Sequence, residues 1–115
     1  MIQLTPQMRI LLAKEPVDFR KGIDGLCGIC RQVLKTDPFN GTVFVFRNSR
    51  ATALKILLYD GQGFWLCQKR LSKGRFRYYP KHVERLAVHE LMLLFWNGNP
   101  EAVRVPFFKE IKFQR

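Results

Sequence analysis

The sequence is poor in the residues that form covalent or metal-bound frameworks. Its 115 residues include three cysteines, and an odd number fits a reducing cytosol better than a set of disulfides. The longest apolar run, residues 91–96, is far shorter than the roughly 18 residues of a membrane span, so we expect no membrane partner. The opening residues 1–6 lack both a basic start and an apolar core, which argues against secretion. We therefore predict a cytoplasmic protein.

Acidic residues and histidines are also scarce. The nine Asp and Glu residues are scattered along the chain, so no pair is placed to hold two catalytic cations. Neither histidine has the serine or cysteine partner of a hydrolytic site. Gly61-Gln62-Gly63 is the nearest approach to a nucleotide-binding glycine motif, and a hairpin turn explains it better. We predict no catalytic residue, no cofactor and no enzymatic activity.

One cysteine pair has the spacing of a zinc half-site or a redox pair. Cys27 and Cys30 enclose two residues, and Cys67, His82 and His89 are the residues available to complete a tetrahedral site. Both cysteines lie on the apolar stripe of an expected helix, and cysteine is often a small buried hydrophobe. We favour the core interpretation and predict no metal site.

What the sequence does have is a concentrated positive charge. Residues 47–85 hold ten Lys or Arg against two acids, a net +8 of the chain's +11. Aromatic rings are interleaved with these cations, which is typical of surfaces that bind nucleic acids. The alternatives are a solvated cationic face or a face that binds an acidic protein. The aromatic residues are Phe64, Trp65, Phe76, Tyr78 and Tyr79.

The apolar pattern predicts one α+β domain, residues 1–100, with a tail at 101–115. With 47% apolar residues the chain has enough for one core. We expect a mainly antiparallel sheet of four to five strands packed with two helices. The strands are predicted at residues 8–13, 42–46, 54–59, 64–71 and 75–79, and the helices at 19–35, with Asp18 as N-cap, and at 83–96.

Two of these elements bear on function. Strict alternation over residues 75–79 places Arg75, Arg77 and Tyr79 on one face of a strand and Phe76 and Tyr78 on the other. That arrangement gives the sheet a cationic face.

The second helix closes at Asn97-Gly98. It is more apolar than a one-sided helix needs, which fits either a partner surface or deep burial. We predict a partner interface at Leu93, Phe95 and Trp96. The tail that follows is interpreted as an extra strand or a docking segment.

A set of motifs in a fixed order extends over residues 9–96. They are residues 16–26 (PVDFRKGIDGL), 37–41 (DPFNG), 43–48 (VFVFRN), 54–57 (LKIL), 59–66 (YDGQGFWL), 69–71 (KRL) and 73–76 (KGRF). In order and spacing they resemble the TnpB accessory proteins of the insertion sequence 66 family of bacterial transposable elements. The resemblance implies a small helper encoded beside a larger transposase, with no established catalytic site. The cysteines of the first helix and the tail depart from the family pattern.

The resemblance and the charge together predict a non-enzymatic protein that binds DNA phosphates at transposon ends and assists a transposase. We expect it in the bacterial cytoplasm, associated with the nucleoid if it binds DNA. The alternatives are an adaptor that docks the transposase without touching DNA and, third, a small metal-dependent nuclease. Phe64 and Trp65 are candidates for base stacking. The candidate DNA contacts are Arg20, Lys21, Arg47, Asn48, Arg50, Lys55, Lys69, Arg70, Lys73, Arg75 and Arg77.

Overall fold

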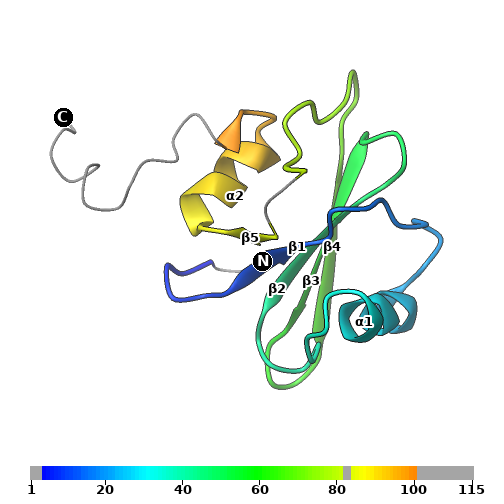
Figure 1. Cartoon of the computed structure of the whole chain (residues 1–115), viewed down its shortest axis with the longest axis vertical. Helices are drawn as coiled ribbons and strands as arrows, with labels where there is room; N and C mark the ends of the chain where they lie inside the picture. Colours follow the sequence, from blue (N-terminus) through cyan, green and yellow to red (C-terminus); the bar gives the residue numbers. More distant parts are fainter. Residues whose placement is uncertain (1–3, 82–83, 101–115) are drawn as a thin grey trace, which may run out of the picture.

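One five-stranded sheet with a helix on each face organises the chain (Figure 1). The computed structural model describes residues 4–81 and 84–100. The sheet has the order β4-β3-β2-β1-β5. The strands are β1 (Ile10–Leu12), β2 (Val43–Arg47), β3 (Ala53–Tyr59), β4 (Phe64–Arg70) and β5 (Arg85–Leu86), and the helices are α1 (Ile23–Gln32) and α2 (Val88–Phe95). The predicted α+β class is confirmed.

Strands β1 and β2, which are neighbours inside the sheet, run parallel because α1 carries the chain back between them. Every residue of β1 is buried, as are the first four of β2. Val43 and Val45 pack in the core under α2, whereas Phe44 and Phe46 pack in the core under α1. Continuous apolar runs of this kind are what a strand covered on both faces requires.

Helix α1 begins later than its sequence pattern predicts. Gly22 occupies the N-cap position without a side-chain cap, so the expected Asp18 cap is wrong. The Asp18 carboxylate instead accepts a hydrogen bond from the backbone N–H of Arg20 at 2.9 Å, and the N–H of Lys21 bonds to the Asp18 carbonyl. These local bonds hold residues 18–21 in a turn and delay the helix.

Strands β2, β3 and β4 form the antiparallel meander that the sequence predicts. The turn between β3 and β4 has Gly61 in the left-handed region at φ 97°. The Asp60 carboxylate accepts the backbone N–H groups of Gly63 and Gln62, each at 2.9 Å. These bonds lower the pKa of Asp60. Gly61-Gln62-Gly63 is therefore a hairpin turn.

The strand predicted at residues 75–79 is wrong. Phe76 and Tyr79, three residues apart, are both buried, whereas Arg75, Arg77 and Tyr78 are exposed. The Tyr79 hydroxyl donates to the carbonyls of Ala13 and Val45, and burial raises its pKa. Two buried side chains that are three residues apart do not fit the two-residue period of a strand. The segment therefore crosses the α2 face as an irregular connection.

The second helix is shorter at its N-terminus than predicted, because residues 85–86 pair with β1 as β5. The Glu90 carboxylate accepts the N–H of Ala87 at 2.7 Å and so completes the start of α2. The helix ends at Asn97-Gly98, as expected. Asn97 takes the left-handed conformation at φ 61°, and Gly98 N–H bonds to the Leu93 carbonyl at 2.8 Å, a Schellman motif. Residue 83 and the predicted tail, 101–115, lie outside the described residues.

Candidate nucleic-acid interface

Most of the candidate cations gather at one end of the sheet. The β2–β3 loop and the segment after β4 lie side by side there, because Leu71 N–H bonds to the Thr52 carbonyl at 2.9 Å and Phe76 N–H to the Ala51 carbonyl at 2.7 Å. Figure 1 shows both connections at the end of the sheet opposite the β3–β4 turn. We call the cations of these two connections and their flanking strand ends the basic rim. Its members are Arg47, Arg50, Arg70, Lys73, Arg75 and Arg77.

The basic rim is exposed and free of acids along its own stretch of chain. All of its members are exposed except Arg47, which is half-buried with its guanidinium 5.4 Å from the centroid of the Tyr79 ring. Between residues 47 and 79 the only acid is Asp60, at the opposite end of the β3–β4 hairpin. Anions that approach the rim therefore meet positive charges with no acid among them in this stretch of the chain.

The Asn48 side chain fixes the conformation of the β2–β3 loop in the basic rim. Its side-chain oxygen accepts the N–H groups of Thr52 at 2.8 Å and Ala53 at 3.2 Å, and its nitrogen donates to the Thr52 hydroxyl at 2.8 Å. Ala51 adopts a positive φ of 57° inside this loop. Asn48 was a candidate DNA contact, but its amide is engaged in the loop that presents Arg50.

Asn97 holds the other half of the rim. Its side-chain nitrogen donates to the Arg75 carbonyl at 3.0 Å, and its oxygen accepts the Arg77 N–H at 3.1 Å. The rim is thus joined to the C-terminal end of α2. Sequence reasoning identified Asn97 as a helix stop, and no local pattern pairs it with a segment 20 residues away.

Two candidate lysines have other roles. The Lys55 side chain belongs to a residue only 8% exposed, and its ammonium donates to the carbonyls of Phe19 at 2.8 Å and Lys21 at 3.0 Å. Lys69 donates to the Phe95 carbonyl at the end of α2 and lies 4.4 Å from the centroid of the Trp96 ring. Lys55 is internal, and Lys69 fastens α2 to the sheet.

Arg20 and Lys21 lie beside the rim, on the loop before α1. This loop is at the same end of the sheet, because Val17 N–H bonds to the Arg47 carbonyl at 2.9 Å. The Arg20 guanidinium is 2.7 Å from the Asp18 carboxylate. This hydrogen-bonded pair lowers the pKa of Asp18 to about 2. Lys21 is exposed and extends the positive surface.

The structure separates both predicted stacking residues from the rim. Phe64 packs with Tyr59 and Phe39, with ring centroids 5.0 and 5.1 Å away. Trp65 is 41% exposed and donates from its indole nitrogen to the Asp60 carboxylate at 2.8 Å. Both residues lie beside the β3–β4 turn, at the far end of the sheet. The exposed ring within the rim is Tyr78, which is 44% exposed.

An apolar groove of about 600 Å³ lies between α2 and the neighbouring strands. Of the predicted interface, Phe95 and Trp96 line it, and Trp96 is 75% exposed. Leu93 is half-buried and does not line the groove. The groove is lined by Leu4, Ile56, Cys67, Gln68, Lys69, Val88, Met92, Phe95 and Trp96.

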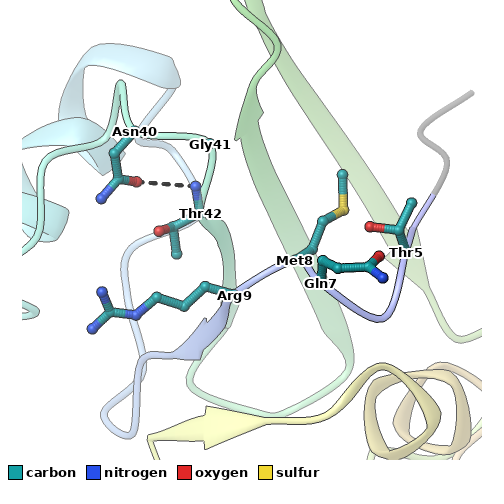
Figure 2. A pocket seen from close by; sticks show the side chains of 7 residues that line it. All are labelled: Thr5, Gln7, Met8, Arg9, Asn40, Gly41 and Thr42. Atoms are coloured by element: carbon teal, nitrogen blue, oxygen red, sulfur yellow. Dashed lines mark hydrogen bonds between the residues drawn. The ribbon is translucent and has the colours of Figure 1, made fainter.

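A second hollow, of about 420 Å³, lies at the starts of β1 and β2 (Figure 2). Its walls include Arg9, Met8 and Thr42, and the Asn40 side chain accepts the Thr42 N–H at 3.0 Å. Figure 2 shows the Arg9 side chain extended beside Thr42. The arrangement forms a turn at the end of the sheet where β1 and β2 begin, away from the basic rim.

The cysteine pair lies in the core. Cys27 and Cys30 are free and buried in the cluster under α1. Burial raises the pKa of Cys27 and raises that of Cys30 to about 12. Over residues 4–81 and 84–100, no three His, Cys, Asp or Glu side chains group as metal ligands. His89 is exposed, and His82 lies outside the described residues. Neither helix in this part of the chain has the length and apolar character of a membrane span.

Comparison with known proteins identifies relatives. The family model described as IS66 Orf2 like protein matches residues 8–103. Two proteins of Sinorhizobium fredii (strain NBRC 101917 / NGR234), the uncharacterized proteins y4jC and y4hO, are each 41% identical to the chain, over 73 and 69 residues. These matches cover 64% and 60% of this chain, and 62% and 60% of the respective relatives, so the chain spans about three fifths of their length. No solved structure matches the chain significantly.

Proposed function

Because the chain belongs to the IS66 Orf2-like family, which is a family of transposition accessory proteins, we propose that it assists transposition by binding DNA phosphates along the basic rim. The observation that carries this proposal is the clustering of six cations, five of them exposed, at one end of the sheet. Two hydrogen-bonded loops present them, so the backbone that carries these side chains is held in place before DNA arrives. A backbone that is already ordered loses less entropy on binding.

The proposed contact is with the DNA backbone. Arg and Lys side chains on exposed loops reach phosphates, and such contacts fix position without reading sequence. Tyr78, exposed between Arg77 and the buried Tyr79, is the ring available for a sugar or an unpaired base. We assign the protein no chemical step of its own, and the cutting and joining of DNA belong to a separate transposase.

A second candidate function is favoured by a different observation. Trp96 and Met92 are large apolar side chains that are exposed on α2 beside the apolar groove. Such a surface fits a protein partner, and the transposase of the same element is the partner we propose for an adaptor role. In that case the groove, rather than the basic rim, carries the function.

The deciding experiment measures binding of the purified chain to labelled duplex DNA at several salt concentrations. The duplexes are an element end and a random sequence of equal length. If about five rim cations each neutralise a phosphate, log Kd against log salt has a slope of magnitude about 4.5. A flat slope contradicts the proposal. Capture of nuclease-treated transposase by a protein that does not shift DNA supports the adaptor instead.

A further inference from the structure

The two edges of the sheet are unequal. β5 has two residues, whereas β4, at the other edge, has seven. Within residues 4–81 and 84–100 no strand pairs with the outer side of β4. A long edge strand of this kind presents a row of unpaired backbone N–H and C=O groups that can pair with another strand. The bonds Asp60 N–H to Gly63 carbonyl and Leu71 N–H to Thr52 carbonyl fix which groups these are. Odd-numbered residues of β4 bond to β3, so Phe64, Leu66, Gln68 and Arg70 direct their backbone groups outward.

We propose that two copies of this chain pair through β4, in antiparallel orientation, about a two-fold axis at Cys67. Outward groups form hydrogen bonds only when even-numbered residues of one strand face even-numbered residues of the other. Among the registers that meet this condition, the one centred on Cys67 pairs all seven residues of β4. It forms about eight backbone hydrogen bonds.

The side chains favour the same register. β4 has its two aromatic residues, Phe64 and Trp65, at one end and its two cations, Lys69 and Arg70, at the other. Antiparallel pairing about Cys67 sets Lys69 opposite the partner's Trp65 and Arg70 opposite the partner's Phe64. Cations then face rings across the strands, which is an attractive pairing. A parallel pairing in register would set like charges side by side.

The β4 edge also adjoins the apolar groove. Cys67 and Lys69 line the groove, and the Lys69 ammonium already lies 4.4 Å from the centroid of the exposed Trp96 ring. In the proposed pair the partner's Trp65 approaches Lys69 from the other side. The pairing thus covers part of an apolar surface that the single chain leaves exposed. It does not rest on DNA binding.

Cys67 provides a chemical test of the register. Directly opposed residues of a non-hydrogen-bonded antiparallel pair have Cα atoms about 4.5 Å apart, which is within disulfide range. Two Cys67 thiols then form one disulfide when diamide takes up their two electrons and two protons. Cys27 and Cys30 are buried and serve as internal controls. We expect the full chain to give a reducible dimer with diamide, and Cys67→Ser to give none while still sedimenting as a dimer.

Gln68 provides a matched pair of variants. Its N–H points outward, so Gln68→Pro removes two bonds of the proposed pair, one from each chain, without removing one to β3. Gln68→Ala keeps the N–H. In sedimentation equilibrium without oxidant, we expect Gln68→Pro to raise the dimer Kd about tenfold or more and Gln68→Ala to leave it near that of the original chain. Circular dichroism checks that both variants are folded.

Three outcomes overturn the proposal. The first is a chain that remains monomeric at every concentration and salt level. The second is a dimer that Gln68→Pro, shown to be folded, leaves unchanged, since such a dimer uses another surface. The third is a dimer that forms no Cys67 disulfide with diamide, which excludes the register centred on that residue.

Discussion

Asn97 accepts a hydrogen bond from the Arg77 backbone N–H at 3.1 Å and so links the end of α2 to the basic rim. Its side-chain nitrogen completes the bridge at the Arg75 carbonyl. The same residue takes the left-handed conformation, φ 61°, that ends the helix. One asparagine therefore stops α2 and positions two arginines that are 20 and 22 residues away in sequence.

Replacing Asn97 separates these two roles. Asn97→Gly keeps the left-handed backbone, for which glycine is well suited, and removes both side-chain bonds. We expect the free energy of unfolding to fall by about 1–2 kcal/mol. DNA affinity should fall by about threefold to tenfold, because the rim segment is no longer held in its binding position. Urea denaturation and fluorescence anisotropy measure the two effects. A stability loss with unchanged DNA affinity would show that Asn97 serves the fold alone.

Lys55 is predicted to contribute to stability rather than to DNA binding. Lys55→Met keeps the apolar stem but leaves the carbonyls of Phe19 and Lys21 without their donor. We expect the free energy of unfolding to fall by about 2–3 kcal/mol, since hydrogen bonds from charged donors are among the stronger ones. The salt slope of DNA binding should not change. Both quantities come from urea titrations and binding isotherms of the folded protein.

Arg50→Ala is the matched comparison for Lys55→Met. Arg50 is exposed at the tip of the β2–β3 loop, so its removal should leave stability within about 0.5 kcal/mol and reduce the salt slope by about 1. If Lys55→Met reduces the slope and Arg50→Ala does not, the assignment of internal and surface roles is wrong.

The sequence predicts the meander well because its signals are local. β2 and β3 are apolar runs of strand length, and a glycine turn follows β3. The same reasoning is wrong for the segment 75–79. Its basic and aromatic residues do alternate in sequence, but its conformation is set by long-range contacts. Tyr79 bonds to Ala13 and Val45, which are distant in the sequence. Tertiary contacts there override a local strand pattern.

The candidate site is predicted in part for the same reason. The density of cations in the sequence locates the charge, but only the hydrogen bonds between loops show that Arg50 and Arg75 belong to one end of the sheet. Lys55 and Lys69 have the charge of a DNA contact, yet each ammonium is used by a backbone carbonyl. A sequence pattern does not show which carbonyl a lysine will reach.

Removing two rim cations tests the electrostatic proposal directly. Arg75→Ala with Arg77→Ala should lower the magnitude of the salt slope by about 2 and weaken binding to element-end and random duplexes alike. The charge-matched control is Arg9→Ala with Arg31→Ala, since Arg9 lies at the start of β1 and Arg31 in the last turn of α1. These positions are away from the rim, so the control should retain the slope. Equal losses in the two double variants would indicate a diffuse charge effect instead of a rim.

Burial of Cys30 makes the free energy of unfolding depend on pH in the alkaline range. The thiol pKa rises from an ordinary 9.0 to about 12 in the folded chain, chiefly because burial disfavours the thiolate. Above pH 9 the unfolded chain has lost this proton and the folded chain has not, so the free energy of unfolding falls as pH rises from 9 towards 12.

Cys30→Ala removes this dependence. In urea titrations under reducing conditions, the stability advantage of the original chain over Cys30→Ala should therefore shrink between pH 8 and pH 10.5. The Tyr79 pKa is also raised, but this residue titrates in both proteins and cancels in the difference. Parallel pH curves for the two proteins would mean that Cys30 ionises as readily in the folded chain as in water.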